Sequence, residues 1–241
     1  MIKRRHFVLG TVGALGAVVV GWSLLPPRQR LSTSRPLPVA AGQSALNGWV
    51  KIASDNSVTV VMCKSEMGQG VHTGLAMLLA EELDADWAHV KIEHSPIDAI
   101  YNNIATLVDG LPFHPDDDGA IKHFAQWMTA KTMREIGVMM TGGSSSIKDL
   151  WLPMRQAGAS ARAMLIGAAA DQWKVNASEC RTEAGRVLHG SGKSASFGEL
   201  AAAAAQRALP TDVKLKDAAN FKLIGKPIKR IEARAKADGT A

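Results

Sequence analysis

Short runs of β-branched and apolar residues alternate with turn formers in the first third of the chain. Residues 49–53 and 58–62 are two such runs, and the turn-forming residues 54–57 separate them. This pattern predicts a β-hairpin. A glycine-containing segment follows at 64–70, and leucines then recur at helical spacing over residues 72–83. The sequence therefore predicts a strand, a glycine loop and a helix in direct succession.

The later part of the chain also combines short strands with longer helices. Residues 141–146 form a second segment of glycine and serine, directly before a long helical stretch at 147–173 that has small and apolar residues on one face. The other predicted elements are a strand at 90–94, a polar loop at 112–119, a helix at 120–135, a hairpin at 179–188 and a helix at 197–208. We therefore expect an α+β fold of short mixed β-sheets with packed helices.

A basic and apolar leader precedes these elements. The basic residues 3–5 stand directly before an uncharged apolar run at 7–25, which is the order of an export signal. The paired arginines favour a twin-arginine signal, which directs a folded protein to the periplasm, over an ordinary signal peptide or a membrane anchor. We expect residues 1–27 to be this signal or anchor and residues 28–46 to be an exposed linker. Cleavage near the small residues 39–41 and retention as an uncleaved tether are both open.

The formal net charge of +6 lies in this leader and its linker. Of the 28 Lys and Arg residues, six lie within residues 1–50, which hold no carboxylate, so 22 basic and 22 acidic residues lie from position 51 onward. Nucleic-acid binding needs basic residues clustered on the folded part, so this class of function is excluded. Two cysteines, Cys63 and Cys180, are too few for an iron–sulfur cluster or a cysteine-rich zinc site. Any redox metal is therefore expected on a cofactor or on a partner chain.

Both glycine segments stand at a predicted helix start. Free backbone N–H groups and the positive end of the helix dipole favour anions at such a place. Ser144, Ser145 and Ser146 add hydroxyl donors, and the planar amide of Gln69 can pair with the edge of a heterocycle. Two such loops suit a ligand with phosphates and a polar ring system, which describes a nucleotide-like cofactor. Taken alone, a run of glycine and serine is also typical of a flexible turn.

The residues around both loops resemble a known family. Residues 66–73, which follow a strand and precede the helix that contains 80–83, resemble the cofactor-binding segment of the molybdopterin-binding large subunit in the xanthine dehydrogenase and aldehyde oxidase family. Residues 141–149 look like a second pterin-contacting segment of that family. The leader and residues 158–173 are most similar to the branch of the isoquinoline 1-oxidoreductase beta subunit, or membrane-bound aldehyde dehydrogenase. The resemblance covers nearly all of residues 1–241.

The resemblance implies a molybdenum hydroxylase, which inserts a water-derived oxygen at an aldehyde carbon or beside the ring nitrogen of a heterocycle. The implied cofactor is molybdenum held by molybdopterin cytosine dinucleotide. The implied partners are an iron–sulfur small subunit and, in exported members, a cytochrome c subunit. By their match to the two family segments, the implied cofactor-binding residues are Gly68, Gln69, Gly70, Thr73, Gly142, Gly143, Ser144, Ser145 and Ser146.

The resemblance also implies that this sequence matches only the N-terminal portion of such a subunit. We expect residues 47–225 to be the N-terminal part of the cofactor-binding domain and residues 226–241 to begin the connection to a hammerhead-like domain. The family's catalytic carboxylate lies in the part that this sequence does not contain, so we assign no catalytic residue and no metal ligand. The expected chain is a subunit portion that is inactive alone. It is either a fragment of a split or frameshifted gene, or a portion whose remainder a separate chain supplies. The alternative is a noncatalytic periplasmic module of the same fold that retains no cofactor.

Four other features have interpretations that do not involve a cofactor. His72 is either a loop residue near the cofactor or an exposed helix cap. Glu81 and Glu82 are expected on the solvated face of an amphipathic helix. The aspartates at 116–118 are expected to form a soluble loop. Three tryptophans are expected in the core or at an interface, namely Trp127, Trp151 and Trp173.

Overall fold

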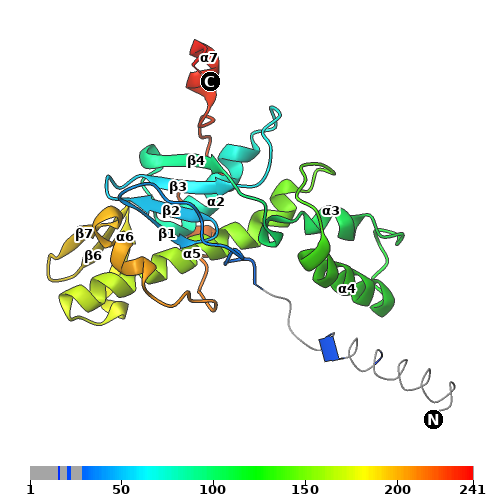
Figure 1. The fold of residues 1–241 in the computed structure, drawn as a ribbon, viewed down its shortest axis with the longest axis horizontal. Helices are drawn as coiled ribbons and strands as arrows, with labels where there is room; N and C mark the ends of the chain where they lie inside the picture. Colours follow the sequence, from blue (N-terminus) through cyan, green and yellow to red (C-terminus); the bar gives the residue numbers. More distant parts are fainter. Residues whose placement is uncertain (1–15, 17–20, 23–28, 241) are drawn as a thin grey trace, which may run out of the picture.

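A four-stranded sheet forms the centre of the fold in the computed structural model, which describes residues 16, 21, 22 and 29–240 (Figure 1). Its strand order is β1–β2–β3–β4, and β3 and β4 are parallel whereas the other neighbours are antiparallel. The strands are β1 (Gln43–Asn47), β2 (Val50–Ala53), β3 (Val58–Met62) and β4 (Val90–His94). The predicted hairpin is confirmed as β2 and β3. Its turn places Asn56 at φ 68°, a left-handed conformation that asparagine tolerates.

The helices that follow the two glycine segments pack against each other. Helix α2 (Val71–Leu83) connects β3 to β4, and the long helix α5 (Ser146–Trp173) packs against α2. The two helices approach closely at Gly158, where a Cβ atom would lie 2.3 Å from the carbonyl oxygen of Leu79. Both helices begin within one residue of their predicted starts. The predicted succession of strand, glycine loop and helix is therefore confirmed.

A second sheet and a pair of helices lie at opposite ends of α5 (Figure 1). The antiparallel strands of the second sheet are β5 (Cys180–Glu183), β6 (Arg186–His189) and β7 (Ser194–Ser196). Within residues 29–240, the other α-helices are α3 (Ile104–Asp109), α4 (Ala120–Ile136), α6 (Phe197–Ala205) and α7 (Ala233–Asp238). Short 3-10 helices are η1 (Trp87–His89), η2 (Ala99–Tyr101), η3 (Ala177–Glu179) and η4 (Ala218–Asn220). The sequence did not predict β1, β7 or α3, and the helix predicted at 197–208 ends at Ala205.

The segment predicted as an exposed linker, 28–46, is exposed at most of its described positions but also has buried ones. Strand β1 begins within it, and Arg30 and Leu31 are buried. Arg30 is held because its guanidinium donates to the backbone oxygens of Ile100 and Asn102, at 2.7 and 2.8 Å. The backbone of Leu31 accepts a hydrogen bond from the N–H of Gly48 at 2.7 Å. Proline and serine therefore mark an irregular segment here, but one that is packed against the fold.

The predicted signal or anchor at residues 1–27 lies outside the described residues, apart from positions 16, 21 and 22. Within the part of the chain that the structure describes, no helix is both long enough and apolar enough to cross a membrane. The export prediction therefore stays a prediction.

The expectation of a solvated face for Glu81 and Glu82 is wrong, because both side chains are 0–1% exposed. Glu82 forms an ion pair with Arg155 at 2.7 Å. Glu81 accepts hydrogen bonds from the backbone of a distant segment, including Leu223 N at 2.6 Å. A segment that returns over α2 from the end of the chain thus covers this helix face. Periodicity along α2 could not reveal it.

The structure agrees with some of the remaining expectations for polar and aromatic residues and differs from others. The three aspartates at 116–118 are exposed, as expected for a soluble loop. Trp173 packs against the core, whereas Trp127 and Trp151 are more than one third exposed. His72 is half-buried, and its Nε2 lies 2.9 Å from the carbonyl oxygen of Lys64, so it is not an exposed cap.

Candidate functional site

Loop 1, which we define as residues 65–70, is organised around the carboxylate of Glu66. This carboxylate accepts hydrogen bonds from the backbone N–H groups of Gly68 at 2.9 Å, Gly70 at 2.8 Å and His72 at 3.1 Å. Burial of the side chain raises the pKa of Glu66, but these hydrogen bonds and nearby Arg230 outweigh burial and hold the pKa below its usual value. Gly68 and Gly70 have φ values of 100° and 78°, which favour glycine.

The prediction of free N–H groups at the start of α2 is therefore wrong. A carboxylate from the same loop already occupies the positive end of this helix. The amide of Gln69 is also used within the loop, because its Nε2 donates to Ser65 O at 2.8 Å and its Oε1 accepts from Met67 N. Hydrogen bonds to its own side chains thus define the conformation of loop 1 in the structure.

Loop 2, which we define as residues 141–145, is held by the hydroxyl of Ser145. This hydroxyl is buried and lies within hydrogen-bond distance of Gly142 O at 2.8 Å, Asn103 Nδ2 at 2.8 Å and Thr106 Oγ1 at 2.6 Å. Gly143 and Ser144 have φ values of 61° and 51°. Loop 2 also contacts loop 1 directly, since Thr141 Oγ1 accepts a hydrogen bond from Ser65 N at 2.8 Å.

The start of α5 differs from the start of α2 because no side chain caps it. Ser145 is the N-cap residue, yet its hydroxyl makes no capping hydrogen bond. The backbone N–H groups of Ser146, Ile147 and Lys148 donate to no residue that the structure describes. These donors and the dipole of a 28-residue helix are available to an anion.

A pocket of about 700 Å³ lies between the two loops. No charged side chain is among its lining residues, which are Met67, Gln69, Gly70, Val71, Gly74, Thr141, Gly142, Ser144, Ser146 and Ile147. Five of the nine predicted cofactor-binding residues line it: Gln69, Gly70, Gly142, Ser144 and Ser146. Its volume is within the range of roughly 300–1,000 Å³ that is typical of small-molecule sites. The structure thus brings the two predicted segments together at one concave surface.

The other four predicted residues lie beside the pocket and support it. Ser145 fixes loop 2, and Gly143 lies next to it with a left-handed backbone. Thr73 is buried in α2, and its hydroxyl accepts a hydrogen bond from Ile231 N at 3.0 Å. The carbonyl oxygen of Gly68 accepts a hydrogen bond from the Arg230 guanidinium.

A buried cluster of three charged residues connects the bases of the two loops. Lys64 precedes loop 1 and forms an ion pair with Asp149, in the first turn of α5, at 3.2 Å. Arg30 forms a second ion pair with Asp149 at 3.1 Å. The three side chains are 0–4% exposed. Asp149 also accepts a hydrogen bond from Ile104 N at 3.0 Å, so this one carboxylate connects four segments.

Sequence reasoning did not assign a role to any member of this cluster. Arg30 was included in the linker, and Lys64 and Asp149 stood at the ends of the two quoted segments without a partner. Lys64 and Asp149 are 85 positions apart, so nothing in the residues around either one indicates that they form a buried ion pair. In the sequence alone, each looks like an ordinary surface charge. The role of Glu66 was also missed, because its hydrogen bonds to residues 68, 70 and 72 depend on the folded conformation of loop 1.

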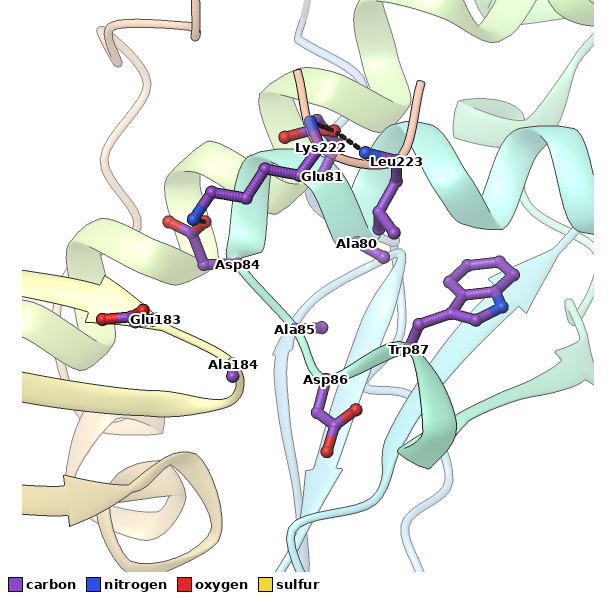
Figure 2. A pocket seen from close by; sticks show the side chains of 10 residues that line it. All are labelled: Ala80, Glu81, Asp84, Ala85, Asp86, Trp87, Glu183, Ala184, Lys222 and Leu223. Carbon is purple, nitrogen blue, oxygen red and sulfur yellow. Dashed lines mark hydrogen bonds and ion pairs between the residues drawn. The ribbon is translucent and has the colours of Figure 1, made fainter. Parts of the chain in front are cut away.

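A second pocket, of about 340 Å³, is a weaker candidate for a site (Figure 2). It holds several carboxylates, but the two at its rim on α2 already have partners. Glu81 accepts from the backbone of residues 222–224, and Asp84 forms an ion pair with Lys216 at 2.6 Å. Figure 2 shows Lys222 beside Asp84 as well. Glu81 and Asp84 therefore connect the C-terminal end of α2 to the segment at 216–224.

The family comparison covers loop 1 but does not reach loop 2. Residues 15–107 match the model of a molybdopterin cofactor-binding domain, and this range includes loop 1. The chain is 32% identical over 203 residues to the isoquinoline 1-oxidoreductase subunit beta of Brevundimonas diminuta. This alignment covers 83% of this chain and 22% of that protein. It is 30% identical over 249 aligned positions to the membrane-bound aldehyde dehydrogenase [pyrroloquinoline-quinone] of Gluconacetobacter polyoxogenes. This alignment covers 100% of this chain and 27% of that protein.

The chain thus spans about a quarter of the length of these two relatives. Among solved structures, it is similar to the reconstituted CO dehydrogenase of Oligotropha carboxidovorans, with 18% identity and a TM-score of 0.40. That similarity covers 64% of this chain and 16% of the other.

Proposed function

We propose that this chain, which belongs to the xanthine dehydrogenase and aldehyde oxidase family of molybdopterin-binding large subunits, holds a molybdenum cofactor in the pocket between loops 1 and 2. The observation that carries the proposal is that two glycine segments, 76 residues apart at their contact, meet at one uncharged pocket of about 700 Å³. A polar ligand of nucleotide size requires such a surface.

The residues present fit a flat group that carries phosphate. Gly70 and Gly142 line the pocket and have no side chain, so a planar ring system can approach their backbone closely. Ser144 and Ser146 add hydroxyl donors at the same wall. The unused N–H groups at the start of α5 would receive the phosphate, whereas the start of α2 would not, because Glu66 already fills it.

The finer parts of the proposal follow from the family and the leader. The bound form is molybdopterin cytosine dinucleotide, and its molybdenum supplies the redox chemistry by which an aldehyde or an N-heterocycle gains a water-derived oxygen. This chain binds and orients the cofactor through loops 1 and 2. An iron–sulfur small subunit and a cytochrome c subunit complete the enzyme. The assembly works in the periplasm after twin-arginine export.

The cofactor proposal predicts a specific loss in a pocket variant. Gly142→Val adds a side chain to the pocket wall without backbone strain, because φ at this position is not positive. We expect it to lower the molybdenum and released cytosine nucleotide of the purified assembly by at least about tenfold, which corresponds to 1.4 kcal/mol of binding. Both are measured by elemental analysis and nucleotide chromatography after co-expression with the proposed partner subunits.

Gly190→Val is the matched control, because a Cβ atom there meets nothing within 4 Å. Equal cofactor content in both variants would contradict the pocket assignment. A wild-type assembly that contains no molybdenum with or without the other chains would favour the alternative, a noncatalytic module. The alternative has one observation in its favour, since Glu66 and Gln69 satisfy loop 1 without any ligand.

The export proposal is tested on the leader. Replacing Arg4 and Arg5 together with lysine is expected to shift most of the protein from the periplasmic to the cytoplasmic fraction, because the export route reads the arginine pair. Arg35→Lys is the control, since Arg35 is exposed and lies beyond the apolar run. Cell fractionation and immunoblotting report the distribution. A wild-type distribution for the double variant would show that the arginine pair is not an address.

A further inference from the structure

A segment from the end of the chain, which we call the C-terminal strap (residues 214–231), passes along α2 and reaches loop 1. It leads toward α7, which projects from the body of the fold (Figure 1). The strap contacts Arg155 and Arg162 of α5 through the backbone oxygens of Lys216 and Lys214. It is also attached at the C-terminal half of α2 and at loop 1, and these two attachments concern the candidate site.

The first attachment is a cradle around Glu81. The backbone N–H groups of Lys222, Leu223 and Ile224 donate to Glu81 Oε2 at 2.8, 2.6 and 3.2 Å, and Figure 2 shows the bond from Leu223. Lys216 adds an ion pair with Glu81 at 3.3 Å. Three backbone donors around one buried carboxylate hold this part of the strap in a single conformation.

The second attachment is at the beginning of α2. Ile231 N donates to the buried hydroxyl of Thr73 at 3.0 Å. The neighbouring guanidinium of Arg230 donates to Gly68 O, and its Nη1 lies 4.0 Å from the Glu66 carboxylate. Arg230 therefore contacts loop 1 from the outside, while Glu66 organises the same loop from the inside.

We propose that Arg230 is a positioning residue for loop 1. The left-handed residues Gly68 and Gly70 give this loop many alternative conformations. Glu66 restricts the loop because its carboxylate accepts hydrogen bonds from three backbone N–H groups. Arg230 restricts it further, because its guanidinium donates to the carbonyl oxygen of Gly68 and lies near the negative charge of Glu66. The strap thus acts as a clamp that keeps Gln69 and Gly70 in the wall of the pocket. The step from loop order to ligand retention rests on the proposed function, whereas the clamp itself does not.

Hydrogen exchange of the full chain tests the clamp without any cofactor. Arg230→Gln is expected to speed exchange of the backbone amides in residues 66–73 by about tenfold, because opening of the loop exposes N–H groups that Glu66 now holds. Thr73→Val, which removes the acceptor for Ile231 N, is expected to act in the same direction. Amides of α5 are expected to exchange as in the wild type, because the core is unchanged.

Arg234→Gln is the matched control, because Arg234 is 96% exposed and pairs only with Asp238 among the contacts within the described part of the chain. Unchanged exchange in Arg230→Gln, or an equal increase in Arg234→Gln, would overturn the proposal. Arg230→Lys keeps the charge and one donor, and it is expected to restore part of the protection. In the cofactor-loaded assembly, Arg230→Gln is expected to lower molybdenum retention. A wild-type assembly without molybdenum would refute the proposed function but leave the exchange result standing.

Discussion

Asp149→Ala is expected to lower the free energy of unfolding by about 3–5 kcal/mol, because it leaves two buried cations without a counterion. Lys64 and Arg30 both pair with this carboxylate, and their side chains are only 0% and 4% exposed. The backbone N–H of Ile104 also loses its acceptor. Since a domain of this kind is stable by roughly 5–15 kcal/mol, the variant is expected to be close to the limit of folding.

Urea unfolding followed by circular dichroism measures this difference. Asp171→Ala is the matched control on the same helix, because Asp171 pairs with Arg207 at the surface and its side chain is 72% exposed. An exposed pair contributes about 0–1 kcal/mol, so the control is expected to unfold nearly as the wild type does. Equal effects of the two substitutions would show that burial of the cluster does not set its contribution.

Deleting residues 1–41 is expected to prevent folding, whereas deleting residues 1–28, which keeps Arg30, Leu31 and Leu37, is expected to be far less destabilising. The longer deletion removes Leu31 and Leu37 from the core, where loss of one buried leucine typically costs about 2–5 kcal/mol. It also removes Arg30, whose backbone oxygen accepts the indole N–H of buried Trp49. These losses together match or exceed the stability of a typical domain.

Circular dichroism and size-exclusion chromatography of the two truncated proteins distinguish these outcomes. A folded protein from the longer deletion would show that residues 29–41 are only an appendage. The expected result bears on processing of the leader as well. A peptidase cut at 39–41 would have the same effect as the longer deletion, so we expect any processed form to retain Arg30.

Elements with a strong local pattern could be predicted from the sequence. The hairpin of β2 and β3, helix α2 and helix α5 follow from alternation and helical spacing, and their bounds were right to within one or two residues. The succession of loop and helix at residues 64–83 was evident for the same reason. Such elements carry their information in neighbours along the chain, so no tertiary contact is needed to recognise them.

The support of the candidate site could not be predicted, because it depends on partners that are distant in the sequence. Glu81 appeared to be a surface residue since its spacing on α2 is that of a polar face, but its partners lie 141–143 residues later. Arg30 appeared to belong to a linker, but it binds Asp149, 119 residues away. Strand β1 was missed in the same way, because its register is set by pairing with β2 and not by its own alternation.

The cradle around Glu81 also has a consequence for the order of folding. Its carboxylate and its three donors lie on segments that are separated by more than half of the chain, so closing this contact costs more loop entropy than closing the local hairpin. The sheet and the pair α2 and α5 can form before the C-terminal strap docks. We therefore expect the strap to be the last unit to form and the first to open, so that its opening leaves the core native while loop 1 loses its outer contact.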